Sequence, residues 1–426
     1  MEALQPSPTS FRHYIPPADT ARSKELAILD TYQWCANRCA EPFVANWKQQ
    51  WIQRCDEPYK GITTDGNVVS DLYRLTPADG DAQNHGAPIK KIVDAAQHLL
   101  AAATPAQRSV LCQNIDAIEW RQWLNPEIYA FRHGLRLEEI SDQLVDAVYG
   151  VLEATLSPAG YARARGCMKV NHFLGQMVNG QRVLNERSYN FTLFGTPSEE
   201  EPWGWQFHGH HFVMNCFVVG TQMVISPVFM GAEPNVIDEG PDKGTELFVD
   251  QERTALELVQ SLDEETLRKV RIFKNLNGPE YPEGRFHRAD QRHLGGAFQD
   301  NRVIPYEGTR VTVLSTPQQQ LVRQLIYLAL NYLPEGALAS KQAEIEAHWE
   351  ETYLCWIGGR GKGAAFCYKI HSPVTMIEFD HHTGVFLNNK EPLPFHIHTL
   401  VRTPNGNDYG KELLRQYQRR QRELSR

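Results

Sequence analysis

The sequence predicts an α+β fold, with a largely helical N-terminal half packed on a mostly antiparallel β-sheet core built from C-terminal hairpins. Two observations support this prediction. Apolar residues recur near helical spacing through much of the first half, and β-rich runs separated by turn residues gather in the second half. Helices followed by clustered hairpins are typical of α+β proteins, because a parallel sheet requires strands and helices that alternate.

The helical signal begins near the N-terminus. Residues 23–53 carry large apolar side chains near helical spacing, and residues 88–175 are also predicted to be mostly helical. Helix starts are indicated where a hydroxyl residue precedes proline, because the hydroxyl caps free N–H groups and proline suits the first turn. These pairs are Thr104-Pro105, Ser157-Pro158 and Thr316-Pro317.

The strand signal is found in a few segments. Segment 56–75, "DEPYKGITTDGNVVSDLYRL", predicts a turn that leads into short strands, with Asp65-Gly66 as a hairpin-type signal. "HHFVMNCFVVGTQMVISPVFMG" predicts two strands around a turn at 219–222. "CWIGGRGKGAAFCYKI" predicts a hairpin with its tip at 358–363. "VTMIEFD" and "FHIHTLVR" predict two further strands.

The chain is predicted to hold one integrated domain. Its 426 residues exceed the usual domain of roughly 100–200 residues, but no linker rich in Pro, Gly or Ser divides it. We expect an extended N-terminal segment over 1–25 and a single α+β domain over 26–426 that ends in a basic helical tail.

Composition excludes several classes of protein. Apolar residues make up 42% of the chain and the formal net charge is −8, unlike a disordered or a nucleic-acid-binding chain. No run approaches the ~18 apolar residues of a membrane span. The eight cysteines form no CxxC pair and the N-terminus does not resemble a secretory signal, so we expect reduced thiols and a cytoplasmic location. The expected partner is a small-molecule substrate, with neither nucleic acid nor membrane; the oligomeric state stays open.

Two predicted strands carry side chains suited to a metal site. Residues i and i+2 of a strand share a face, so His396 and His398 point the same way, as do Glu378 and Asp380. If the strands pair with Glu378 opposite His398, the two carboxylates and the two imidazoles meet on one face. Such side chains are ligands of first-row metals. The alternative is a solvated face on which histidines and carboxylates pair.

The string "FHGHH" adds a second group of histidines. In an extended strand, His208 and His210 face one way and His211 the other, so all three bind one ion only if Gly209 breaks the extended geometry. We expect His210 and His211 to approach the metal site from another hairpin. The alternative is structural, with a bulge at Gly209 and one histidine capping a turn.

Two polar segments are predicted to face a substrate. "FHRADQRHLGGAFQDNRVIPYEG" offers His293, Gln299, Asp300 and Asn301, and "RTPNGNDYG" offers Asp408 at the mouth of a strand that ends near Arg402. An ordinary solvated loop and a turn at Asn405-Gly406 are the structural alternatives. No GxSxG, Walker or HExxH motif is present.

Several strings in this order resemble one known family. "PYKGITTDG", "LSPAGYARA", "FGTPSEEEPWGWQFHGHHFVMN", "RHLGGAFQDNRVIPYEG", "YKIHSPVTMIEFD" and "HIHTLVRTPNGNDYG" are similar to the domain-of-unknown-function family numbered 3500, over residues 30–415. The resemblance implies a single family domain and no particular reaction. Its pattern matches, in this chain, His210, His211, Glu378, Asp380, His396, His398, Arg402 and Asp408.

The residues favour a metal-dependent hydrolase or lyase that acts on a small organic molecule. The expected ligands of the divalent zinc or iron ion are His210, His211, His396 and His398. Glu378 would be a further ligand or the base, and Glu378, Asp380 and Arg402 are the expected catalytic residues. A metal-free acid–base isomerase or cyclase, an Fe(II)-dependent oxygenase and a non-catalytic small-molecule-binding protein are alternatives.

Overall fold

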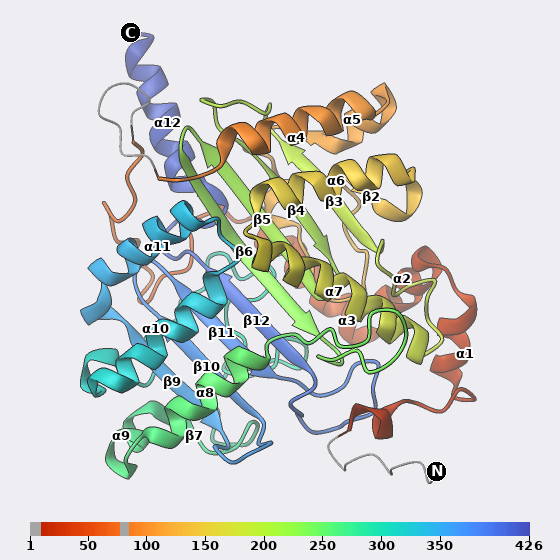
Figure 1. Cartoon of the computed structure of the whole chain (residues 1–426), viewed down its shortest axis with the longest axis vertical. Coiled ribbons are helices and arrows are strands. Elements are labelled where there is room, and N and C mark those ends of the chain that lie inside the picture. The colour runs from red at the N-terminus through yellow and green to blue at the C-terminus, as the bar shows by residue number, and fades with distance from the viewer. Residues whose placement is uncertain (1–9, 77–84) are drawn as a thin grey trace.

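A twelve-stranded mixed sheet forms the centre of the computed structural model of the chain, which describes residues 10–76 and 85–426 (Figure 1). The strand order is β1-β3-β4-β5-β6-β12-β11-β10-β9-β7, with β2 beside β3 and β8 beside β9. The long strands are β3 (Tyr189–Phe194), β4 (Trp203–Gly209), β5 (Phe212–Val219), β6 (Gln222–Ala232), β9 (Tyr353–Gly358), β10 (Phe366–His371), β11 (Met376–His381) and β12 (Ile397–Arg402). The short strands are β1 (Cys112–Gln113), β2 (Leu135–Arg136), β7 (Arg271–Phe273) and β8 (Thr309–Arg310).

The sheet is mixed: most of its strand pairs are antiparallel, as expected, and the pairs at its two ends are parallel. The β1–β3 and β7–β9 pairs are parallel, whereas the long central strands pair antiparallel. Parallel pairing needs a long crossover, and helices lie between β1 and β3 and between β7 and β9 in the chain. These edge strands have two or three residues each, too few for a period-two pattern to reveal them.

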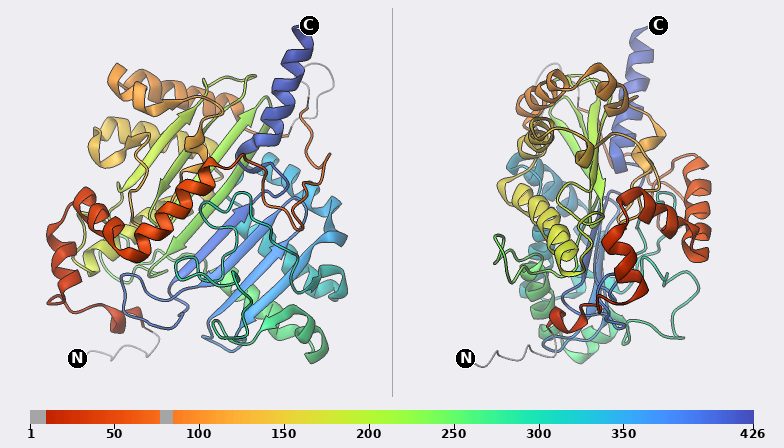
Figure 2. Two further views of the ribbon diagram at one scale, coloured as in Figure 1. Left: turned by 180° about the vertical axis from the view of Figure 1, so that it is seen from behind. Right: turned by 90° about the vertical axis from the view of Figure 1, so that its right-hand side faces the viewer.

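Helices cover both faces of the sheet. Figure 1 shows α4 to α8 and α10 on one face, and the reverse view of Figure 2 shows α1 to α3 and the long loops between β7 and β9 on the other. The α-helices are α1 (Ala21–Ile28), α2 (Thr31–Ala40), α3 (Pro42–Asp56), α4 (Ile89–Ala102), α5 (Pro105–Leu111), α6 (Asp142–Thr155), α7 (Pro158–Met177), α8 (Val249–Ser261), α9 (Glu264–Val270), α10 (Thr316–Leu330), α11 (Glu335–Ala347) and α12 (Lys411–Leu424). Short 3-10 helices are Phe11–Tyr14, Ile118–Arg121, Leu137–Glu139, Val311–Val313, Trp349–Glu351 and Asp408–Gly410.

The predicted helix starts hold at two of three positions. Thr104 and Ser157 cap α5 and α7, and each accepts a hydrogen bond from a backbone N–H of the first turn. For α10 the cap is Ser315, one residue before the predicted Thr316, because Ser315 and Gln318 form a reciprocal capping box.

Two local expectations differ from the structure. The predicted short strands in 56–75 are absent from that described stretch apart from an isolated bridge between Thr63 and Val303; the segment instead follows the surface through turns. In the N-terminal segment, residues 10–25 contain a 3-10 helix and the start of α1, because Ser10 and Thr20 both cap helical turns. Residues 1–9 of that segment lie outside the described residues.

The two faces of the sheet bury side chains of different kinds. The face under α4, α6, α7, α8 and α10 is the larger apolar core. The opposite face carries an aromatic cluster that includes Trp51, Trp120 and Phe298, and beside it a patch of buried polar side chains. This polar patch on a sheet buried on both sides is the feature that identifies the site. Within the described ranges, no helix combines the length and apolar character needed to cross a bilayer.

Candidate metal centre

One ligand of the candidate centre comes from the turn of the β4–β5 hairpin. β4 ends at Gly209 and β5 begins at Phe212, which leaves His210 and His211 as the turn residues. His211 has φ 59°, a left-handed conformation that costs an ordinary residue about 1 kcal/mol or more. Its N–H donates to the carbonyl of Asn125, and its own carbonyl accepts from Gly231 N–H. The turn therefore fixes the direction of the His211 imidazole. The chain reverses its direction at His211, and the extended geometry is not broken at Gly209.

The other two ligands come from β12 and the residue before it. The strands β11 and β12 pair antiparallel, with Asp380 opposite His398 and Glu378 opposite Leu400. The predicted pairing is thus confirmed, with the register shifted by two residues from the one assumed. A shift by two keeps Glu378, Asp380 and His398 on the same face.

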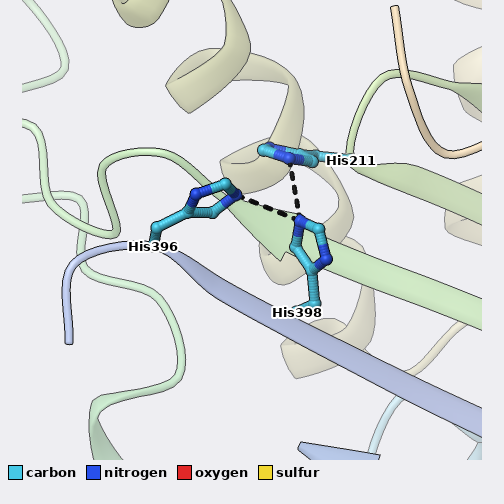
Figure 3. A group of neighbouring side chains, drawn as sticks. All are labelled: His211, His396 and His398. Carbon is cyan, nitrogen blue, oxygen red and sulfur yellow. Dashed lines mark hydrogen bonds between the residues drawn. The ribbon is translucent and has the colours of Figure 1, made fainter. Parts of the chain in front are cut away.

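Three imidazole nitrogens converge where these elements meet (Figure 3). The Nε2 atom of His398 lies 3.1 Å from Nε2 of His396 and 3.1 Å from Nε2 of His211. Nitrogens bound to one ion at roughly 2.0–2.1 Å in tetrahedral geometry lie about 3.3–3.4 Å apart. Both separations from His398 are therefore close to the spacing of ligands to a single ion, and all three ligand atoms lie within 4.8 Å of one another.

Hydrogen bonds alone do not satisfy both nitrogen–nitrogen contacts of this cluster. Nδ1 of His396 lies 2.7 Å from the Thr383 carbonyl, which only accepts, so Nδ1 carries the proton and Nε2 of the neutral ring presents a lone pair. Nε2 of His398 carries at most one proton and cannot donate along both 3.1 Å contacts. A metal ion would accept all three lone pairs at once, and the His396–carbonyl hydrogen bond is a common orienting contact for a ligating histidine.

Burial keeps the cluster neutral. The three side chains are at most 5% exposed, and this desolvation is the main cause that lowers the pKa of His396 and holds the pKa of His211 and His398 well below the usual 6.5. Neighbouring imidazoles lower the pKa of His211 and His398 further. Neutral imidazole is the protonation state that a metal ligand requires.

The absence of a side chain at Gly231 makes room for two of the rings. Gly231 on β6 lies opposite His398. A Cβ built at this position would lie 3.0 Å from Cδ2 of His398 and 3.3 Å from Cδ2 of His211. A side chain at this position would therefore crowd both imidazoles, so the site requires glycine here although glycine takes no part in the chemistry.

A second group of potential ligands lies against the first. Ligand atoms of His293, Asp380 and His382 lie within 4.8 Å of one another, as do those of His211, His396 and His398. The His382 ring centroid is 3.8 Å from that of His398. His293 reaches this position from the loop between β7 and β8 and was expected to contact substrate.

Two of the expected site residues, His210 and Glu378, lie next to the three-histidine cluster but form hydrogen bonds with other groups. His210 stacks on His211, with ring centroids 3.9 Å apart, but its Nδ1 is 2.8 Å from Oδ1 of Asn171. Burial lowers the pKa of His210 to about 4. The carboxylate of Glu378 accepts the N–H groups of Leu294 and Gly295 at 3.0 Å. Glu378 therefore anchors the loop that carries His293, and we withdraw its assignment as metal ligand or base.

Arg402, Asp300 and Asp408 form a buried ion-pair network away from the histidines. Arg402 donates to Asp300 at 2.6 Å and to Asp408 at 2.8 Å, and all three are at most 2% exposed. Arg402 lies four residues beyond His398 on β12, roughly 13 Å at about 3.3 Å per residue. Their charged atoms are directed at one another, so we withdraw the catalytic role of Arg402 and the substrate role of the two aspartates.

Gln299 and Asn301 are the remaining two residues that were expected to contact substrate, and they lie on the surface side of the loop between β7 and β8. Asn301 receives the N–H of Lys60 at 2.8 Å and donates to the Pro58 carbonyl at 2.9 Å, which fixes one chain segment to another. Gln299 and Asn301 line a cavity of about 370 Å³ together with Trp47, Arg54, Arg121 and Arg302. Neither belongs to the two groups of potential ligands.

Three residues near the centre were not assigned from the sequence. His382 continues the alternation of Glu378 and Asp380 on the same face, so the period-two rule would have revealed it. Glu233 is buried with Oε1 3.8 Å from Nδ1 of His396 and accepts three backbone N–H groups from residues 385–387. Arg292 pairs with Asp380 at 2.6 Å. No local pattern in the sequence points to these last two contacts, because each joins distant segments.

The fold and the centre together define an α+β protein with a buried, histidine-rich polar site. A family model described as "Protein of unknown function (DUF3500)" matches residues 85–411 of the 426, so the chain belongs to this family, as its motifs indicated. No curated protein and no solved structure matches the chain.

His208 of the same string is separate from the centre and predicts a pH effect. Its ring stacks on His133 with centroids 4.9 Å apart, its Nε2 has no hydrogen-bond partner, and burial holds its pKa well below 6.5. Below pH 6.5 the unfolded chain binds a proton that the folded chain excludes, so stability is lost as the pH falls. One such histidine costs up to about 1.4 kcal/mol per pH unit until its folded pKa is reached.

We therefore expect His208→Gln to flatten the loss of stability between pH 7 and pH 5. The measurement is the free energy of unfolding in urea at pH 5, 6 and 7, on metal-free protein. The exposed His98 on α4 provides the control, since His98→Gln should leave the slope unchanged. Equal slopes for wild type and His208→Gln would show that His208 does not titrate differently in the folded chain.

Proposed function

We propose that the protein is a metal-dependent hydrolase or lyase that acts on a small organic molecule, with a zinc or iron ion held by His211, His396 and His398. The observation that carries this proposal is the convergence of three buried, neutral imidazoles at 3.1 Å contacts that hydrogen bonding alone does not satisfy. Imidazole is a preferred ligand of both ions.

The number of ligands favours catalysis over a structural role. Structural zinc sites are closed by four protein ligands, whereas catalytic sites use three and keep a position for water or substrate. The ion would polarise a carbonyl oxygen and lower the pKa of a bound water to about 7. Burial strengthens these effects, because the charge acts in a region of low dielectric constant.

Acid–base chemistry without a metal is supported less well. A general base works best with a pKa near the working pH, whereas burial holds the pKa of His211 and His398 well below 6.5. Neither imidazole is paired with a carboxylate that would raise its basicity. An Fe(II)-dependent oxygenase is supported by the donor set of the second group, two histidines and one carboxylate, which is the set used by such enzymes.

The location proposed for the protein is the cytoplasm. All eight cysteines are free thiols, and six of them are buried. A reducing compartment is where a chain with this many unpaired thiols is normally found.

Metal analysis of the wild-type protein tests the proposal. The chain should be purified without a metal-affinity tag and measured by plasma mass spectrometry. We expect at least one equivalent of zinc or iron per chain that survives gel filtration. A chain that carries no stoichiometric metal, and binds neither Zn²⁺ nor anaerobic Fe²⁺ added afterwards, would exclude the metal-dependent enzyme and favour acid–base catalysis.

A further inference from the structure

We infer that a second metal ion binds beside the first, held by His293, Asp380 and His382, and that the centre is therefore dinuclear. This inference rests on the proposed function only for the first ion. The second ion would be bound by other residues, none of which is a ligand of the first ion.

The second group has the composition and spacing of a metal site. It offers two imidazoles and one carboxylate whose ligand atoms all lie within 4.8 Å of one another. Oδ2 of Asp380 lies 3.1 Å from Nε2 of His382. All three residues are buried, so water does not easily take the place of a missing partner.

Unpartnered nitrogens give a second, independent observation. Nε2 of His293 and Nε2 of His382 are both buried and neither has a hydrogen-bond partner. The 3.1 Å separation between His382 and Asp380 lacks the angles of a hydrogen bond, so proximity alone does not satisfy this nitrogen. Buried polar atoms are almost always satisfied in folded proteins. An ion between these atoms would satisfy both nitrogens and could also bind Oδ2 of Asp380.

The surrounding structure holds the three ligands in place. Arg292 donates its Nε–H to Oδ1 of Asp380 at 2.6 Å and its backbone N–H to Oδ2 at 3.4 Å, and Oδ2 lies 3.1 Å from Nε2 of His382. Glu378 accepts the N–H groups of Leu294 and Gly295, directly after His293. A carboxylate on the strand therefore fixes the loop that delivers the third ligand. Outer contacts of this kind orient metal ligands in known sites.

The two groups are direct neighbours. The His382 ring centroid lies 3.8 Å from that of His398 and 5.5 Å from that of His396. Asp380 also lies opposite His398 in the sheet register. Two ions held side by side could hold an attacking water and polarise an oxygen of the substrate. The class of substrate that this arrangement fits is an ester, amide or phosphoester whose oxygens reach both ions.

The ordinary explanation for the second group is a metal-free ion pair between Asp380 and His382. That pair would require a protonated imidazole. Arg292 already neutralises the carboxylate, and the 3.1 Å approach of His382 Nε2 to Oδ2 of Asp380 lacks the angles of a hydrogen bond. The pair also leaves His293 without any role. A bound cation accounts for all three side chains.

Metal stoichiometry of single-ligand variants tests the inference. Full-length metal-free protein is titrated with Zn²⁺ in a calorimeter and, separately, with Co²⁺ followed by its visible absorption. We expect two equivalents for the wild type, one for His211→Ala and one for His293→Ala. The two single-site variants should give different Co²⁺ spectra, because one retains a carboxylate ligand and the other does not. Asp380 is left unchanged because its loss would leave the buried Arg292 guanidinium without its neutralising carboxylate.

The outcomes separate this inference from the proposed function. One equivalent in the wild type that is lost in His211→Ala and kept in His293→Ala would overturn the second site and leave the first intact. One equivalent that either variant abolishes would show a single shared ion and would also overturn it. No binding in the wild type would overturn both proposals. Each variant is checked by circular dichroism and melting temperature, and His382→Ala replaces His293→Ala if the latter is unfolded.

Discussion

His398→Ala is expected to weaken metal binding at the three-histidine site by at least about 100-fold and to abolish any activity, with little change in the fold. Nε2 of His398 is the only one of the three that lies within 3.1 Å of both others. Its removal leaves His211 and His396 as the two remaining ligands of the site. A catalytic site with three protein ligands tolerates such a loss poorly, because no spare ligand replaces it.

The fold should survive because the pairing of β12 positions the His398 side chain, whereas that pairing does not depend on the side chain. His398 lies on β12, which is the middle one of three strands. β12 pairs with both β6 and β11 through backbone hydrogen bonds that alanine retains. The imidazole contacts other imidazoles that are themselves costly to bury. We expect the melting temperature of the metal-free variant to stay within a few degrees of the metal-free wild type.

His371→Ala is the matched control. His371 is also buried on a strand of this sheet, its two ring nitrogens have no hydrogen-bond partner, and it belongs to neither ligand group. It should bind as much Zn²⁺ as the wild type. If His398→Ala instead unfolds when the metal is lost, the ion is structural, because its binding energy is then folding energy. If His398→Ala binds Zn²⁺ as tightly as the wild type, the three-histidine centre is wrong.

The period-two rule is the reason that part of the site was predictable. It needs only that 376–381 and 397–402 are strands, and it then places alternate side chains on one face whatever even register is chosen. Asp380 and His398 could therefore be assigned to one face from the sequence. His211 was predictable only as one of two, because the choice between His210 and His211 depends on a left-handed turn residue.

The errors arise where long-range contacts decide the role of a charged residue. Glu378 and Arg402 share the face of the histidines, as the pattern indicates, but their partners are residues 294–295, Asp300 and Asp408. The loop and the strands are about 80–100 residues apart in the chain. No local pattern shows that a carboxylate binds backbone N–H groups from so far away. The parallel edge strands were missed for a similar reason, since their pairing depends on helical crossovers.

Arg402→Met is expected to lower the free energy of unfolding by about 3–5 kcal/mol, the largest loss of stability for any single change proposed for this chain. The guanidinium joins Asp300 and Asp408 through hydrogen bonds of 2.6 and 2.8 Å, and it donates to the Gly295 carbonyl at 2.8 Å. Methionine fills much of the volume but leaves two buried carboxylates without this partner. Arg121 still pairs with Asp300 at 2.9 Å, so Asp408 loses most.

Urea unfolding of metal-free protein at pH 7 measures this loss of stability. Two further variants provide the comparison. Arg415→Met breaks an exposed ion pair with Glu412 and should cost at most about 1 kcal/mol. Tyr409→Phe removes the hydroxyl that donates to Asp300 at 2.9 Å and accepts from Nε1 of Trp123 at 2.8 Å, and should cost about 1–3 kcal/mol. It therefore reports on the network if Arg402→Met does not fold. Zn²⁺ stoichiometry should be unchanged in every variant that folds, because the network lies roughly 13 Å along the strand from His398. A loss below about 1 kcal/mol for Arg402→Met would mean that the carboxylates find other partners, and a loss of metal with the fold intact would return Arg402 to the site.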